Sequence, residues 1–138
     1  MAQTERVWMT FPDGGRGQVA VTPLGEGRYR LEETPLLYVE DVYFGDEIDT
    51  EGGPDGTLRM RGVARRSGFR TYSWMLSRSI ASSPAMAAFR DAVIAAGGRW
   101  EQTFGGSFMA HVPADCPFDP EVAFAGVVQV SKSTASES

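Results

Sequence analysis

The chain has 138 residues, with 13 Lys+Arg, 18 Asp+Glu and one His, which together give a formal net charge of −5. This length predicts one domain, or two very small modules that share a core, and a hydrophobic content of 42% is enough to build that core. One cysteine (Cys116) and one histidine (His111) exclude an internal disulfide framework and the common His/Cys metal sites.

The first half of the chain predicts a series of short strands. Alternating apolar residues between turn clusters favour strands at 6–11, 18–24, 28–32 and 42–50, with a tight turn at 25–27 and a bend at 45–46. A strand at 57–66 and a returning strand at 70–77 follow, joined by a turn at 67–69. Gly45 and Gly68 lie where a strand bends or turns, which are positions that tolerate a positive φ.

The second half predicts two helices around a hairpin. Ser83 suits an N-cap and Pro84 the first helical position, and a Gly-Gly pair at 97–98 ends that helix. A hairpin over residues 100–104 and 107–112 follows, and Pro120 opens a second, short helix. We therefore expect an α+β fold, with an antiparallel N-terminal sheet or small β-barrel followed by a strand-helix-hairpin-helix layer.

The domain organisation expected from this pattern is simple. Residues 1–130 form one domain, of which 5–80 are mostly β and 81–130 are helix, hairpin and helix. Residues 131–138 are rich in serine and are expected to form a disordered tail.

Charge is segregated along the chain. Residues 32–55 hold nine acids and no base, whereas residues 57–80 hold six arginines and no acid. One interpretation is that the two blocks lie on adjacent strands and pair across the sheet. The other is an arginine face that stays open to an anionic partner. Because a tight turn at 52–56 joins the blocks, we favour internal pairing.

No arrangement of side chains predicts catalysis. A Cys116–His111 dyad is conceivable, but His111 alternates with apolar residues and is expected to face solvent, while Cys116 suits a small buried hydrophobe. Asp46, Glu47, Asp49 and Glu51 lack apolar neighbours that would raise a pKa. Asp46, Asp49 and Asp55 lack the spacing of a calcium-binding loop. The Gly-rich segment around Arg16 lies between strands, so it lacks the helix of a phosphate loop. We therefore predict no catalytic residue, cofactor or metal.

The segment of residues 65–74 interleaves arginines with aromatic residues. Arg65, Arg66 and Arg70 suit phosphates, and Tyr72 suits stacking on a base, so this segment could bind RNA or DNA. A sequence pI near 4.8 opposes this interpretation, because nucleic-acid readers usually carry a positive field.

Several short motifs resemble a bacterial family known only as domain-of-unknown-function family 4265. They cover about residues 5–128 and are Tyr29-Arg30-Leu31, Thr34-Pro35-Leu36, Gly45-Asp46, Gly56-Thr57-Leu58 and Ser67-Gly68-Phe69-Arg70-Thr71. The resemblance implies a shared fold and a cytoplasmic bacterial protein, and it implies no activity. In that pattern Glu33 stands in place of Asn, Leu36 in place of Phe, and Phe69 in place of the His of the turn. The loss of that His favours a binding or structural role over a catalytic one, unless His111 compensates. A third hypothesis is therefore an enzyme that uses His111 with a nearby acid.

The function expected from the sequence is therefore that of a small, non-enzymatic cytoplasmic protein that binds another protein. No apolar run approaches the ~20 residues of a membrane span, and the first residues lack a signal pattern, so no membrane partner is expected. A regulatory module or an immunity-type inhibitor would suit the size and acidity. In the latter, Asp46, Asp49 and Glu51 would form the contact surface and steer a basic partner. The sequence does not indicate an oligomeric state.

Overall fold

The computed structural model describes residues 3–35, 42–103 and 106–136. Contacts divide the chain into two compact units, residues 1–67 and residues 68–138. Some predicted features lie outside the described residues. They are the carboxylates Glu40 and Asp41 of the acidic block, the hairpin residues Phe104 and Gly105, and the end of the expected tail at 137–138. The expectation of a single domain over residues 1–130 stays a prediction.

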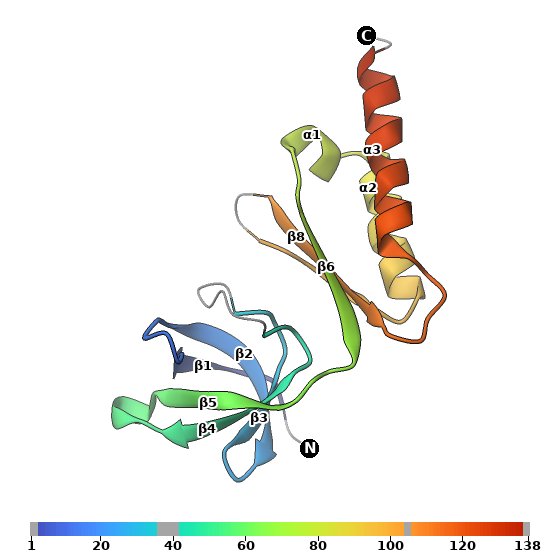
Figure 1. The fold of residues 1–138 in the computed structure, drawn as a ribbon. Helices are drawn as coiled ribbons and strands as arrows, with labels where there is room; N and C mark the ends of the chain where they lie inside the picture. The colour runs from blue at the N-terminus through green and yellow to red at the C-terminus, as the bar shows by residue number, and fades with distance from the viewer. Residues whose placement is uncertain (1–2, 36–41, 104–105, 137–138) are drawn as a thin grey trace. The chain divides into compact units, whose positions relative to one another are not determined.

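The first unit is a closed five-stranded barrel (Figure 1). Its strands are β1 (Glu5–Thr10), β2 (Arg16–Gly25), β3 (Arg28–Leu31), β4 (Glu47–Gly52) and β5 (Leu58–Arg65). Consecutive strands pair antiparallel, and the barrel closes because β5 pairs in parallel with β1. A 3₁₀ turn, η1 (Pro54–Gly56), joins β4 to β5. The small β-barrel expected from the sequence is thus present.

The interior of the barrel is apolar. Period-2 alternation turns one face of each strand inward, so that Met9 is buried between the exposed Trp8 and the half-buried Thr10. The buried residues of this core are Met9, Phe11, Val19, Val21, Leu31, Val42, Ile48 and Met60. The pattern that places Met60 inward places Arg59 and Arg61 on the outer surface of the barrel.

One predicted strand is shorter than expected. We predicted a strand over 42–50, but β4 begins at Glu47 and residues 43–46 form a turn. Gly45 adopts a φ of 89° in this turn, and Gly68 adopts a φ of 84°, as expected. The turn is held by its own backbone hydrogen bonds, since the amide of Asp46 donates to the carbonyl of Tyr43 and that of Gly45 to the carbonyl of Leu31.

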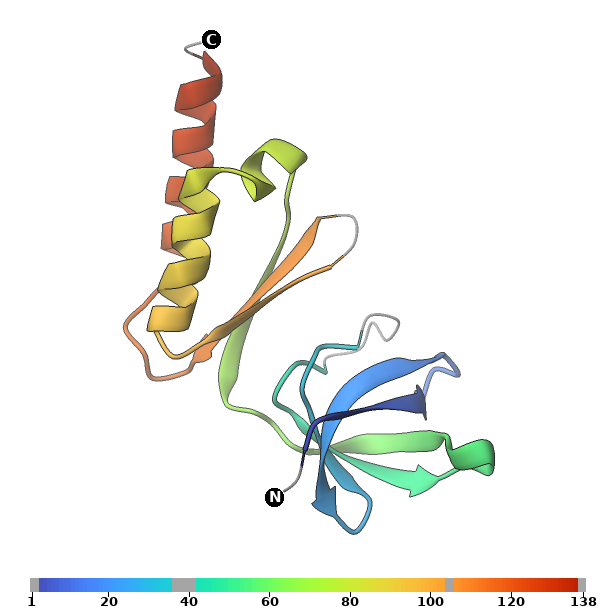
Figure 2. The ribbon, with the colours of Figure 1, turned by 180° about the vertical axis from the view of Figure 1, so that it is seen from behind.

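The second unit is a three-stranded sheet covered by helices. Its elements are β6 (Phe69–Met75), α1 (Arg78–Ala81), α2 (Pro84–Ala95), β7 (Arg99–Gln102), β8 (Ser107–Pro113) and α3 (Pro120–Ser136). The sheet order is β6-β8-β7, with β8 antiparallel to both neighbours. Figures 1 and 2 show α2 and α3 on the same face of this sheet. The fold is therefore α+β, as predicted.

The partner of β6 differs from the prediction. The turn at 67–69 suggested a hairpin with the strand before it, but β6 pairs with β8 along its whole length, from Phe69 opposite Pro113 to Met75 opposite Ser107. A local turn signal does not reveal a partner strand that lies about 40 residues further along the chain.

The helices of the second unit bury one apolar face. Ser83 caps α2 by accepting a hydrogen bond from the amide of Met86 at 3.1 Å, as predicted. The core residues are Leu76, Met86, Phe89, Val93, Phe108, Ala110, Val112, Phe124 and Val127. Helix α3 runs to Ser136, so it includes most of the segment expected to be a disordered tail; once the turns up to Val127 are anchored in the core, further helical turns need no new nucleation.

Candidate functional site

The acidic and arginine blocks pair within the barrel. Strand register places Glu51 of β4 opposite Arg59 of β5, and this carboxylate lies 3.4 Å from Arg59 and 3.5 Å from Arg61. Asp49 pairs with Arg28 of β3 at 3.1 Å. Because neighbouring strands carry the two blocks, the internal pairing expected from the sequence is present at these positions. Two of the three carboxylates predicted to contact a partner are therefore already engaged.

The third carboxylate, Asp46, has a structural position. Its residue is only 2% exposed, and its oxygens accept hydrogen bonds from the amides of Tyr43 at 3.1 Å and Ser67 at 2.9 Å. Arg66 also contacts it at 3.1 Å. Asp46 thus joins the turn before β4 to the end of β5, and it offers no exposed carboxylate to a partner.

The predicted basic and aromatic hairpin does not form. Arg65 and Arg66 end the barrel unit, whereas Tyr72 lies on β6 of the second unit. The ring of Tyr72 stacks on Trp74 with 6.2 Å between centroids, and both rings pack against the core beneath the helices. Trp74 in turn stacks on Phe124 of α3 at 4.4 Å. These aromatic rings serve as core, which leaves them unsuited to stacking on bases.

Arg70 is an anchor inside the second unit. Its guanidinium donates to the carbonyls of Cys116 and Phe118, both at 3.1 Å, and to the hydroxyl of Tyr72 at 3.0 Å. Desolvation acts to lower the pKa of Arg70, but the hydrogen bond to Cys116 and the neighbouring Tyr72 outweigh it, so the pKa lies above its ordinary value. The side chain is cationic and ties β6 to the connection before α3.

His111 is buried, and the expectation that it faces solvent is wrong. It lies on the face of the β6-β8-β7 sheet opposite to Phe108, Ala110 and Val112, yet it is 0% exposed. Its Nδ1 lies 2.8 Å from the hydroxyl of Thr71, and its Nε2 lies 2.6 Å from a carboxylate oxygen of Glu101. Alternation along the strand predicted the face correctly, but it could not show that the ring is buried and has hydrogen-bonding partners on both neighbouring strands.

The chain Thr71–His111–Glu101 resembles an acid-base relay in its connectivity. An ionised carboxylate only accepts hydrogen bonds, so Nε2 of His111 carries a proton toward Glu101, while Nδ1 shares a hydrogen bond with the hydroxyl of Thr71. A base acts on a group within hydrogen-bond reach, but no atom of this ring is exposed to a substrate. Cys116, which the sequence analysis considered as a partner of His111, contacts Arg70 and the carbonyl of Phe118.

Neither metal nor membrane sites emerge from the part of the chain that the structure describes. Among residues 3–35, 42–103 and 106–136, no three His, Cys, Asp or Glu side chains are placed to hold a metal ion. Within the same ranges, every helix is too short or too polar to cross a membrane.

The outer face of β1, β2 and β5 carries an exposed cluster that the sequence analysis missed. Trp8 is 47% exposed, and the guanidinium of Arg16 lies over its ring, 4.6 Å from the centroid. Thr10 follows Trp8 by two residues on β1, and it pairs with Arg16 of β2 on one side and with Arg59 of β5 on the other. We call Trp8, Thr10, Arg16 and Arg59 the barrel patch. Its signal in the sequence is the turn at 12–15, which brings Arg16 back beside Thr10.

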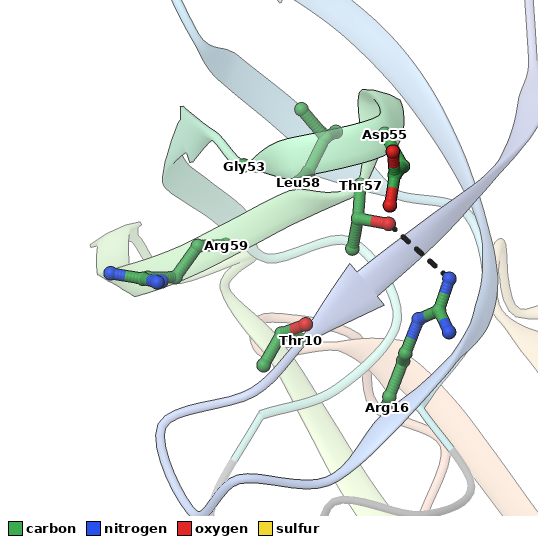
Figure 3. Close-up of a pocket in the computed structure, with 7 residues that line it drawn as sticks. All are labelled: Thr10, Arg16, Gly53, Asp55, Thr57, Leu58 and Arg59. Atoms are coloured by element: carbon green, nitrogen blue, oxygen red, sulfur yellow. Dashed lines mark hydrogen bonds between the residues drawn. The ribbon is translucent and has the colours of Figure 1, made fainter.

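A pocket of about 260 Å³ adjoins the barrel patch. It is lined by Thr10, Arg16, Gly53, Asp55, Thr57, Leu58 and Arg59. Arg16 donates to the hydroxyl of Thr57 at 3.4 Å, and Figure 3 shows the carboxylate of Asp55 beside this pair and the Arg59 side chain directed away from it. Asp55 lies in the turn η1, where its backbone adopts a φ of 59°. The walls therefore offer hydrogen-bond donors and acceptors side by side.

The fold and this patch define a two-unit α+β protein in which a small closed barrel precedes a helix-covered sheet. A family model described as Domain of unknown function (DUF4265) matches residues 17–123, so the chain belongs to that family. A solved structure, a hypothetical protein from Neisseria gonorrhoeae, is 12% identical, covers 95% of this chain and 89% of its own, and superposes with a TM-score of 0.53. This likeness shows the fold. No curated protein matches the sequence.

Proposed function

We propose that the chain is a small, non-enzymatic cytoplasmic protein of a bacterium that binds another protein through the barrel patch, as a regulatory or immunity-type interaction module. The single observation that carries this proposal is the half-exposed Trp8 held beneath Arg16. Tryptophan and arginine are the residues that most often dominate protein interfaces, because they supply large contact area and several hydrogen-bond donors. On this barrel they adjoin a pocket.

The arrangement of charge supports the barrel patch over the acidic block as the contact surface. Asp46 is buried, and the carboxylates of Asp49 and Glu51 lie against arginines of neighbouring strands. A partner would have to displace those arginines to reach the acids. The indole of Trp8, by contrast, is half exposed.

A protein partner suits the chain better than a nucleic acid. The net charge is −5, whereas proteins that bind nucleic acid usually carry a positive field. Tyr72, which the sequence offered for base stacking, packs against the core of the second unit together with Trp74. Binding to RNA or DNA is therefore one of the outcomes that the experiment must distinguish.

Site-specific photo-crosslinking tests the proposal. A photoreactive residue at position 18, which pairs with Trp8 across β1 and β2, should capture one defined protein in cells, identified by mass spectrometry. A photoreactive residue at the exposed Gln129 of α3 is the matched control and should capture none. With the captured protein purified, Trp8→Ala should weaken binding at least tenfold. Equal capture at both positions, or capture that nuclease abolishes, would overturn the proposal.

A further inference from the structure

Two arginines flank one threonine in the barrel patch. Thr10 pairs with Arg16 on β2 and with Arg59 on β5, so the two arginines lie on strands that are separated only by β1. Strands two apart in a sheet are about 10 Å from each other. The long, flexible side chains of two arginines at that separation can converge on one group lying above the strand between them. Thr10 and Thr57 add hydroxyl groups at the same place.

We propose that this pocket binds a carboxylate group of the protein partner, held between the guanidinium groups of Arg16 and Arg59. This inference rests on the proposed function and names the chemistry that the partner presents. Guanidinium matches a carboxylate in shape and charge, because its planar N–H groups donate two parallel hydrogen bonds. The two threonine hydroxyls can donate to the same oxygens.

Both arginines are available for such a ligand. The guanidinium of Arg16 donates to the hydroxyl of Thr57 at 3.4 Å, which is a long and weak hydrogen bond. The side chain of Arg59 is directed away from the Arg16–Thr57 pair and lies 3.4 Å from Glu51, so it must turn toward the pocket to reach a shared ligand. The side chains of Arg59 and Glu51 are 63% and 45% exposed, which leaves room for that change. Exposed ion pairs of this kind contribute little, so a carboxylate that engages both arginines competes with them.

Asp55 narrows the choice of anion. Its carboxylate lines the same pocket, and it repels a dianion such as phosphate more strongly than a singly charged carboxylate. It also accepts hydrogen bonds, so it suits a ligand that carries an N–H near its carboxylate. A peptide has this combination both at its C-terminus and beside an acidic side chain. The chemistry shared by both sources is a carboxylate adjoining a backbone amide.

Titrations of the ¹⁵N-labelled full chain with short peptides test the inference. The probes are acetyl-Leu-Leu-Gly with a free carboxylate, the same peptide as its C-terminal amide, acetyl-Leu-Glu-Leu amide, and inorganic phosphate. The signals to follow are the indole N–H of Trp8 and the backbone amides of Thr10 and Thr57. Saturable shifts with the first peptide assign a C-terminal carboxylate, and shifts with the Glu peptide assign an acidic side chain.

Three variants locate the binding. Arg16→Gln should weaken carboxylate binding at least tenfold, and Arg59→Gln severalfold. Arg61→Gln is the matched control, because Arg61 shares β5 and the partner Glu51 with Arg59 but does not line the pocket. It should leave binding unchanged. Asp55→Asn keeps a residue that tolerates the left-handed backbone, and it should let phosphate bind more tightly than it binds the original chain.

The inference is overturned if no probe shifts these signals, or if acetyl-Leu-Leu-Gly amide binds as well as the same peptide with a free carboxylate. It is also overturned if phosphate binds more tightly than both carboxylate peptides, or if Arg16→Gln leaves peptide binding unchanged. Its failure is distinguishable from that of the proposed function. Capture of a defined protein from position 18, with loss on Trp8→Ala, would leave the interaction surface in place and remove only the carboxylate as its ligand.

Discussion

Asp46 provides the sharpest test of how the barrel is held together. The change Asp46→Ala removes the acceptor for two backbone amides, those of Tyr43 and Ser67, which the carboxylate binds at 3.1 and 2.9 Å. A buried donor left without a partner costs about 1–3 kcal/mol, and both amides belong to half-buried residues, so each should cost toward the lower end. The ion pair with Arg66, whose own side chain is 55% exposed, adds at most about 1 kcal/mol. We expect the free energy of unfolding of the barrel to fall by about 2–4 kcal/mol.

The assay follows amide signals of β1–β5 during urea denaturation by NMR, so that the barrel is measured separately from the second unit. Asp46→Asn should cost about half as much, because its amide retains one oxygen and can satisfy only one of the two backbone donors. Asp49→Ala is the control: that carboxylate is 49% exposed and makes one exposed ion pair, so the loss should stay below about 1 kcal/mol. A loss below 0.5 kcal/mol for Asp46→Ala (about the expected scatter for an ordinary surface substitution) would refute this reasoning.

Three further changes test the second unit. His111→Ala removes a fully buried ring and its bonds to Thr71 and Glu101, and should lower the free energy of unfolding by about 2–4 kcal/mol in urea; a loss under about 1 kcal/mol would contradict the enclosed geometry. In the unmodified chain, imidazole ¹⁵N shifts should show a proton on Nε2 of His111, and a proton on Nδ1 alone would be inconsistent with donation to Glu101. Gly98→Ala places a methyl group in steric overlap with the carbonyl oxygen of His111 and should destabilise by about 3 kcal/mol. Gly126→Ala, with open space around it in α3, should stabilise by about 0.5–1 kcal/mol, and equal effects of the two changes in thermal unfolding would argue against the close approach at Gly98.

Elements with a local cause could be predicted from the sequence. Ser83 and Pro84 specify the start of α2 through a cap and a fixed φ, and the structure places both as expected. The hairpin of β2 and β3 forms over the glycine-rich turn at 25–27 because both glycines adopt positive φ. Each of these features is decided within a few residues, so one sequence is enough.

Features that depend on distant partners could not be predicted in this way. The same alternation in β6 is compatible with pairing to β5 or to β8, and only the second choice buries Tyr72 and Trp74 beneath the helices. The environment of His111 likewise depends on Thr71 and Glu101, which belong to two other strands. Burial of a polar side chain is decided by whether such partners exist, and strand periodicity does not contain that information.

The charge segregation explains why the sequence directed attention to the acidic block as a contact surface. Opposite charges gathered into consecutive strands meet each other when those strands pair, so the most conspicuous blocks neutralise one another, as Glu51 does with Arg59 and Arg61. The residues of the barrel patch are few and dispersed, and barrel closure alone brings Trp8 and Arg16 beside Arg59. It follows that a binding surface on such a barrel is better sought from the register of β1 with β2 and β5 than from runs of like charge. The carboxylate titration at Arg16 tests that principle on this chain.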